Sequence, residues 1–246
     1  LAIKATGAIP VKSKAKNWGH DLELMSNLVD DNTKLVFIAS PNNPTGTAKT
    51  LIEIKDFLDN LSDDILVFLD QAYFEYIEGS EFDIPFSLIS DHPNLVISRS
   101  FSKAHGLAAL RLGFCVSNPE LSDYLNRVRQ PFNANSLALD LGKIALADQE
   151  HISKSIKINS DGMDKVKKAF ANLNYNFIES WGNFISFDAK QDSDIAFQYF
   201  LERGVILRSL KVYEMPQHLR VSIGTEEEMN FFLQVLEDYE KDLSKK

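Results

Sequence analysis

Four short runs of continuous apolar residues constrain the fold of this chain most. They span residues 35–39, 65–69, 95–97 and 112–116, and each is too short to be read as a buried helix. Amphipathic segments lie between runs, and the first has the helical spacing of Leu51, Ile54, Phe57, Leu58 and Leu61. Buried strands that alternate with helices are typical of a parallel sheet covered on both faces. The sequence therefore predicts an α/β fold with a mostly parallel sheet.

The second half of the chain has a different pattern. A helix is predicted over 134–147, and a long connecting helix follows, with a weak point at Gly162. The remaining segments predict strands at 183–187, 205–207 and 219–223, a helix at 195–202, and a last helix that opens with the capping-box sequence Thr225-Glu-Glu-Glu228. We therefore expect a large domain over residues 1–150 and a small α+β domain over 151–246. Residues 2–12 are predicted to form a further strand.

Composition excludes several classes of protein. The net charge is −9 over 246 residues, and no basic run suggests nucleic acid as a partner. No apolar run approaches the ~18 residues of a membrane span. The single cysteine, Cys115, excludes an internal disulfide and fits a reducing compartment, so we expect a cytoplasmic protein. His105, His151 and His218 lack the spacing of metal ligands, and we expect no metal site.

Three polar residues, Asn43, Asp70 and Lys103, follow three of the predicted strands. Ligands bind beyond the carboxyl ends of the strands in open parallel sheets, so these side chains are candidates for one shared site. Each also has a plainer interpretation. Asn43 fits a simple turn, Asp70 fits a helix cap, and Lys103 fits a solvated loop.

The segment around Lys103 is the most specific motif in the sequence. It reads Ser98-Arg-Ser-Phe-Ser-Lys-Ala-His-Gly-Leu-Ala-Ala-Leu-Arg-Leu-Gly-Phe114, with Arg111 eight positions after the lysine. This segment resembles the cofactor-lysine segment of fold-type-I aminotransferases that depend on pyridoxal 5'-phosphate. The resemblance implies that Lys103 forms the Schiff base with the cofactor, and that Ser100, Ser102 and Arg111 hold its phosphate. His105, next to this lysine, is interpreted as a packing residue.

Two further segments extend the resemblance toward the front of the chain. Ser40-Pro-Asn-Asn-Pro-Thr-Gly46 resembles the family turn whose asparagine, here Asn43, bonds the phenolic oxygen of the cofactor. Asp70-Gln-Ala-Tyr73 resembles the segment in which Asp70 pairs with the pyridine nitrogen and Tyr73 bonds the same phenolic oxygen. A carboxylate beside that nitrogen keeps it protonated, which lets the ring accept electrons. Gln71 stands where the family more often has Glu, and we assign it no chemical role.

The C-terminal half carries the candidates for substrate binding. Leu219-Arg-Val-Ser-Ile-Gly-Thr225 resembles the family segment whose arginine, here Arg220, clamps the substrate carboxylate, and Trp181-Gly-Asn-Phe184 makes Asn183 a weaker candidate. The alternative for Arg220 is an ion pair with an acid on an edge strand. Arg129-Gln-Pro-Phe-Asn-Ala-Asn135 is similar to a motif of histidinol-phosphate aminotransferases. Gly204-Val-Ile-Leu-Arg208 is similar to part of their C-terminal segment, and the resemblance implies that Arg208 reaches the substrate phosphate. A structural ion pair is the alternative for Arg208.

The resemblance implies a homodimeric enzyme with pyridoxal 5'-phosphate, a small-molecule amino donor and a 2-oxo acid acceptor. The expected reaction converts L-histidinol phosphate and 2-oxoglutarate to imidazole acetol phosphate and glutamate. Alternatives are another aminotransferase, for example one for aromatic amino acids, or a phosphoamino-acid decarboxylase of the same fold. A non-catalytic effector domain or a truncated, inactive chain are the alternatives outside enzymes. The family's glycine-rich phosphate loop, ring-stacking aromatic residue and lent tyrosine are not found ahead of Leu1, so we expect the sequence to lack the family's N-terminal part.

Overall fold

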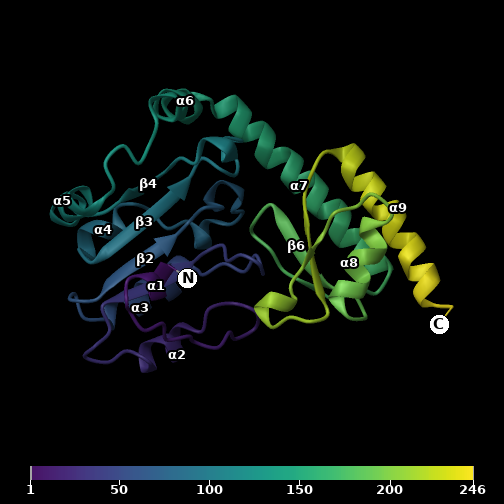
Figure 1. Cartoon of the computed structure of the whole chain (residues 1–246), viewed down its shortest axis with the longest axis horizontal. Helices are drawn as coiled ribbons and strands as arrows, with labels where there is room; N and C mark the ends of the chain where they lie inside the picture. Colours follow the sequence, from purple (N-terminus) through teal and green to yellow (C-terminus); the bar gives the residue numbers. More distant parts are fainter. Residues whose placement is uncertain (1, 246) are drawn as a thin grey trace.

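A computed structural model describes residues 2–245 and contains two four-stranded sheets joined by a long helix (Figure 1). The first sheet has the order β1-β2-β3-β4. Its strands are β1 (Leu35–Ala39), β2 (Leu66–Asp70), β3 (Leu95–Ser100) and β4 (Gly113–Val116). The first three are parallel, as predicted, whereas β4 runs antiparallel to β3. The four predicted strands and the mostly parallel sheet are thus confirmed.

One face of the first sheet forms a hydrophobic core with two helices. Alternate residues of the strands point to this face, and they pack against α3 (Leu51–Asp59) and α4 (Leu88–Asp91). Thr50 and Glu53 cap the start of α3 in a reciprocal capping box, which fixes where that helix begins. The predicted helix between the first two strands is therefore confirmed.

The other face of this sheet is open along β1. Leu35 is 53% exposed and Phe37 is 50% exposed, although both are large and apolar. Phe37 stacks against Phe68 of the neighbouring strand at 5.7 Å between ring centroids. The expectation that helices cover both faces is therefore wrong for this part of the sheet within residues 2–245.

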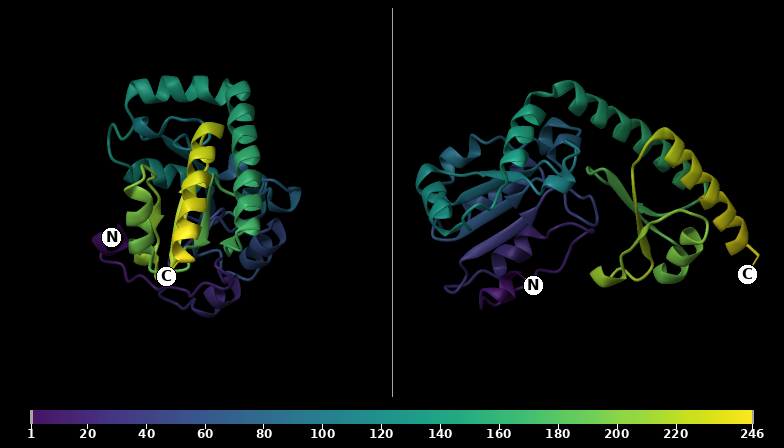
Figure 2. Two further views of the ribbon diagram at one scale, coloured as in Figure 1. Left: turned by 90° about the vertical axis from the view of Figure 1, so that its right-hand side faces the viewer. Right: turned by 45° about the horizontal axis from the view of Figure 1, so that its top comes forward.

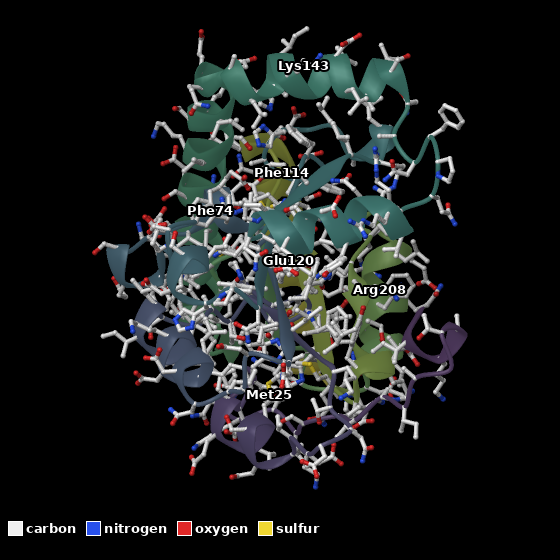
Figure 3. All side chains as sticks on the ribbon, turned by 90° about the vertical axis from the view of Figure 1, so that its left-hand side faces the viewer. Met25, Phe74, Phe114, Glu120, Lys143 and Arg208 are labelled. Atoms are coloured by element: carbon white, nitrogen blue, oxygen red, sulfur yellow. The ribbon has the colours of Figure 1, made fainter. Side chains whose placement is uncertain are left out.

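Three helices lead from the first sheet to the second: α5 (Pro119–Val128), α6 (Ser136–Ala147) and α7 (Gln149–Asn172). α6 lies along the upper edge of the molecule in Figure 3, where it carries Lys143. α7 runs unbroken through Gly162, so the predicted weak point is wrong. A side-chain carbon at Gly162 would lie 2.6 Å from the Cγ2 atom of Ile223, so this glycine permits close packing.

The second sheet is antiparallel and has the order β5-β6-β8-β7. Its strands are β5 (Phe177–Ile178), β6 (Phe184–Asp188), β8 (His218–Ser222) and β7 (Arg208–Ser209). α7, α8 (Ser193–Leu201) and α9 (Glu226–Leu243) pack on it around an aromatic core (Figure 2). The central rings of that core are Phe170, Phe187, Phe200 and Phe232. Thr225 and Glu228 form the predicted capping box at the start of α9.

Two predicted strands are wrong. Residues 2–12 contain α1 (Ala2–Ala5) and no strand, because the exposed chain that follows pairs with no other segment. Residues 205–207 are irregular, and pairing with β8 begins only at Arg208. Val205 and Leu207 are buried while Ile206 is 79% exposed, which explains the strand-like alternation.

The remaining elements are short. They comprise α2 (Leu22–Asn27) and the 3₁₀ turns η1 (Phe74–Tyr76), η2 (Ser80–Phe82), η3 (Ala108–Leu110) and η4 (Lys211–Tyr213). Within residues 2–245, none of the helices has the length and hydropathy needed to cross a membrane. Each sheet has its own hydrophobic cluster, and we propose the start of α7 as the boundary between domains 1–150 and 151–246.

Candidate active site

The carboxyl ends of β1, β2 and β3 meet at one edge of the first sheet. The register aligns Ala39 with Asp70, and Asp70 with Ser98. The turn after β1 therefore lies beside the turn after β2, which lies beside the turn after β3. This is the edge at which the sequence predicts a ligand site.

Lys103 faces the ring of Tyr73 across this edge. The Nζ atom of Lys103 lies 4.8 Å from the centroid of the Tyr73 ring, and Tyr73 is buried. The lysine turn is closed by two backbone hydrogen bonds: Gly106 N–H donates to Lys103 O, and Leu107 N–H donates to Phe101 O, each at 2.9 Å. Gly106 has a φ of +72°, which only glycine adopts without strain. Lys103 thus belongs to a defined turn, and its side chain is half-buried.

Asp70 is held by its own turn. Its Oδ1 atom accepts a hydrogen bond from Ala72 N–H at 2.9 Å and one from the Ser98 hydroxyl at 3.4 Å. The next helical turn, η1, starts at Phe74 without a side-chain cap, so the interpretation of Asp70 as a helix cap is wrong.

The candidate phosphate ligands of the lysine turn contact one another: Ser100, Ser102 and Arg111. Arg111 donates from Nη1 to the Ser102 hydroxyl at 3.4 Å and to Ala108 O at 3.0 Å. The Ser100 hydroxyl accepts a hydrogen bond from Ser102 N–H at 3.1 Å. Two hydroxyls and a guanidinium thus lie within one turn, a donor set that suits a phosphate.

Asn43 and Arg220 join the two sheets. Asn43 Oδ1 accepts a hydrogen bond from Arg220 Nη1. Arg220 lies on β8, which is between β6 and β7, and among residues 2–245 it has no acidic partner within 4.0 Å. The interpretation of Arg220 as an ion-paired residue on an edge strand is therefore wrong. Its Nε atom is buried without a hydrogen-bond partner in the described part of the chain, so it retains a donor for a ligand.

The turn that carries Asn43 is bonded to both sheets. Ser40 N–H donates to Asp70 O of β2 at 2.9 Å. The Ser186 hydroxyl donates to Pro44 O at 2.6 Å, and Trp181 N–H donates to Gly46 O at 2.8 Å. Gly46 has a φ of +80°, and a side-chain carbon there would collide with Ser180. The sequence Ser40–Gly46 thus builds more than a simple turn, because it docks onto the second sheet.

Phe184 is a residue of this site that the sequence did not single out. The Tyr73 ring meets the Phe184 ring edge-on at 5.2 Å, and the Arg220 guanidinium carbon lies 4.9 Å from the same ring. Phe184 therefore connects the lysine side of the site to the arginine side. Its only sequence signal was its position directly after Asn183.

The two weaker candidates lie at the edge of this group. Arg208 is opposite Arg220 in the β7–β8 register, so both side chains leave the same face of the sheet. Arg208 is exposed and, among the described residues, has no acid within 4.0 Å, which contradicts a structural ion pair. Asn183 lines a hollow of about 370 Å³ together with Tyr76 and His151.

One of the residues that line this hollow contacts the lysine turn, since His151 Nε2 lies 3.1 Å from Ala104 O. Burial raises the pKa of Tyr76, whose hydroxyl lies 3.3 Å from that of Ser155. A larger open groove of about 940 Å³ runs past Trp18, Lys49 and Glu179, away from Lys103 and Asp70. Of the candidate residues only Asn183 lines the smaller hollow, and neither hollow is lined by Lys103, Asp70 or Arg220. We place the site at the carboxyl edge of the first sheet, where Lys103 meets Tyr73 and Asn43 meets Arg220.

His105 packs against Phe101 at 4.9 Å between ring centroids, as the packing interpretation predicted. Among residues 2–245, no group of three or more His, Cys, Asp or Glu side chains is arranged to hold a metal ion.

Comparison with known proteins identifies the family. The sequence model of aminotransferase class I and II matches residues 2–236, and the chain belongs to this family. It is 46% identical over 237 residues to histidinol-phosphate aminotransferase 1 of Nitrosococcus oceani, and 47% identical over 236 residues to histidinol-phosphate aminotransferase 2 of Pseudomonas fluorescens. Each alignment covers 96% of this chain and 64% of the relative, so the chain spans less than two thirds of these proteins.

Solved structures agree on the fold, which is that of fold-type-I aminotransferases. The histidinol-phosphate aminotransferase of Sinorhizobium meliloti, crystallised with pyridoxal-5'-phosphate, superposes with a TM-score of 0.89 at 25% identity, over 98% of this chain and 67% of that one. L-threonine-O-3-phosphate decarboxylase of Porphyromonas gingivalis superposes with a TM-score of 0.74 at 23% identity, over 87% of this chain and 66% of that one. The second likeness concerns the fold alone.

Proposed function

We propose that this chain carries the catalytic residues of a pyridoxal-phosphate-dependent histidinol-phosphate aminotransferase. The proposed reaction transfers the amino group of L-histidinol phosphate to 2-oxoglutarate, which gives imidazole acetol phosphate and glutamate. The sequence likeness to two histidinol-phosphate aminotransferases at 46% and 47% identity supports this substrate. The observation that carries the proposal is the continuous contact of Lys103, Tyr73, Phe184, Arg220 and Asn43 across both sheets.

The residues present fit pyridoxal 5'-phosphate. Ser100, Ser102 and Arg111 offer hydroxyl and guanidinium donors for its phosphate, and Asp70 offers a carboxylate for its pyridine nitrogen. Asn43 and Tyr73 would bond its phenolic oxygen. When bound, the cofactor supplies an electron-accepting ring that makes the substrate Cα–H acidic.

The protein groups divide the remaining tasks. Lys103 would bind the cofactor covalently and then, as a free amine, accept the proton from the substrate Cα and deliver it to the C4′ carbon of the cofactor. The Phe184 ring, packed between Tyr73 and Arg220, would exclude water from the reacting atoms. Arg220 would hold the carboxylate of 2-oxoglutarate, and Arg208 the phosphate of L-histidinol phosphate; Asn183 would line the substrate space.

The test uses Lys103→Ala beside a control at Lys143, an exposed lysine on α6. Borohydride reduction of the cofactor-loaded wild type should leave one stable adduct on Lys103, found by peptide mass spectrometry. Lys103→Ala should lose the adduct and transamination together, whereas Lys143→Ala keeps both. An adduct on another lysine contradicts the proposal.

A substrate panel separates the candidate reactions. Amino-group transfer from L-histidinol phosphate supports the proposed substrate, and faster transfer from aromatic amino acids points to another aminotransferase. Release of CO₂ from O-phospho-L-threonine indicates a decarboxylase. A protein without the visible absorption of bound cofactor would be a non-catalytic member of the fold.

We further propose that the protein is a cytoplasmic homodimer. The family likeness and the single, unpaired Cys115 support this proposal. Sedimentation velocity at micromolar concentration tests it, and a monomer at that concentration contradicts it.

A further inference from the structure

Several polar side chains are buried or half-buried near the Lys103–Tyr73 contact. His105 Nε2 lies 3.7 Å from Glu75 Oε1, with the two side chains 8% and 14% exposed. Arg99 donates from Nε to Gln71 Oε1 at 3.0 Å, and its guanidinium carbon lies 3.2 Å above the centroid of the Phe74 ring. Phe74 is labelled in Figure 3.

These contacts join the same two turns that carry the site. Gln71, Phe74 and Glu75 belong to the turn after β2, and Glu75 is two residues beyond Tyr73. Arg99 belongs to β3, and His105 is two residues beyond Lys103. The turns thus touch at two places, through Lys103 and Tyr73 and through Glu75 and His105.

The burial of Gln71, Glu75 and His105 lowers the stability of the fold. Gln71 Nε2, Glu75 Oε2 and His105 Nδ1 are all buried without a hydrogen-bond partner among the described residues. Each such atom loses its hydrogen bonds to water on folding without a replacement, and an apolar side chain of the same shape avoids that cost. Burial raises the pKa of Glu75, although Arg99 and His105 oppose the rise. Burial also lowers the pKa of Arg99 to about 10. A buried charge group of this kind is better explained by what it orients than by what it stabilises.

We propose that Glu75 is a positioning residue that fixes the Lys103 turn against the Tyr73 turn through His105. This proposal rests on the proposed function only in taking Lys103 and Tyr73 as the reacting pair. The amine of Lys103 has to reach both the cofactor and the substrate Cα. A displacement of about 1 Å at such a group can lower the rate about 100-fold.

The test compares Glu75→Gln and His105→Phe in the full chain. Glu75→Gln keeps the side-chain shape, His105→Phe keeps an aromatic ring, and both remove the polar contact between the two side chains. Glu78→Gln is the matched control because Glu78 is exposed on the same segment. Glu75→Gln should lower kcat at least ~tenfold with KM for the amino donor within ~twofold, since positioning acts on the reacting amine and not on substrate binding. Glu78→Gln should leave both values unchanged.

Two readouts do not depend on turnover. In cofactor-free protein, the rate of acetylation of Lys103 by acetic anhydride should change at least ~threefold in Glu75→Gln and in His105→Phe, and not in Glu78→Gln. The double variant should lose no more than the worse single variant, because both changes break one contact.

The outcomes separate the two proposals. Absence of a Lys103–cofactor adduct in the wild type contradicts the proposed function. Unchanged acetylation and kcat in Glu75→Gln, or additive losses in the double variant, overturn the positioning role and leave the function standing. If Glu75→Gln does not fold, His105→Phe decides the positioning role by the same measurements.

Discussion

Replacing Gly46 with alanine tests how the two sheets meet at the site. Gly46 has a φ of +80°, and an added side-chain carbon would lie 2.9 Å from the Cα atom of Ser180 and closer still to its side chain. Rotation of a side chain cannot relieve contact with a backbone atom, so the turn or the Ser180 segment has to move. That movement would pull Asn43 away from Arg220 and strain the bond between Trp181 N–H and Gly46 O.

The magnitude follows from two contributions. An L-residue at positive φ costs about 1–2 kcal/mol, and forcing an extra carbon into packed surroundings costs about 1–3 kcal/mol more. Gly204→Ala is a matched control, because Gly204 has a φ of +81° but its added carbon would lie 3.8 Å from Phe231, an ordinary contact. The difference between the two variants therefore isolates the collision with Ser180.

Urea unfolding and thermal melting measure this difference. Gly46→Ala should lose about 1–3 kcal/mol more free energy of unfolding than Gly204→Ala. For a chain of this size, that corresponds to a Tm about 2–12 °C lower. The cofactor affinity of Gly46→Ala should also fall, while that of Gly204→Ala stays at the wild-type value. Equal losses of stability in the two variants would refute the close approach of the Asn43 turn to Ser180.

Three further predictions concern single side chains. Asp70→Asn should keep the cofactor bound but slow proton abstraction severely, and stopped-flow absorbance with L-histidinol phosphate measures this rate. Near-normal turnover would mean that the Asp70 carboxylate only stabilises the turn after β2. Arg208→Ala should weaken the half-reaction with L-histidinol phosphate about ten- to a hundredfold more than the half-reaction with 2-oxoglutarate. Arg220→Lys should weaken the half-reaction with 2-oxoglutarate more, because an ammonium lacks the planar fork of a guanidinium. Equal effects on both half-reactions would contradict the assignment of L-histidinol phosphate as the substrate. His20 Nε2 accepts a hydrogen bond from Ala39 N–H at 3.1 Å, and burial lowers its pKa below the ordinary value of 6.5. As pH falls, His20 therefore becomes protonated in the unfolded chain before it does so in the folded protein. The free energy of unfolding should thus fall as pH drops below about 6.5, and it should fall less in His20→Gln.

The sequence was most informative where one physical requirement has one sequence solution. Buried strands need continuous apolar residues, and the four runs predicted all four strands of the first sheet. The candidate site around Lys103 was predicted from the resemblance of residues 98–114 to the family segment. The direction of a strand in its sheet cannot be predicted in this way, because a continuous apolar run has the same pattern in a parallel and in an antiparallel strand. The antiparallel pairing of β4 with β3 therefore had no signal.

Other features could not be read because the residue type suggests a commoner role. Phe184 looks like an ordinary core residue, yet it packs between Tyr73 and Arg220. Glu75 looks like a surface charge in a turn, yet it is largely buried beside His105. Phe37 looks like core and is half exposed. In each case the distinguishing fact is the position of a segment far away in the sequence.

The anchoring of the Asn43 turn determines which parts of the site move together. Ser186 and Trp181 bind the Ser40–Gly46 turn to the second sheet, and Arg220 of that sheet binds Asn43 itself. Lys103 and Asp70 remain with the first sheet. Ser40 N–H donates to Asp70 O at 2.9 Å, so the first residue of the turn stays with the first sheet. A hinge rotation between the sheets would therefore be absorbed within the turn, between Ser40 and Asn43. Asn43 would move with Arg220, and the distance of this pair to Lys103 and Asp70 would change.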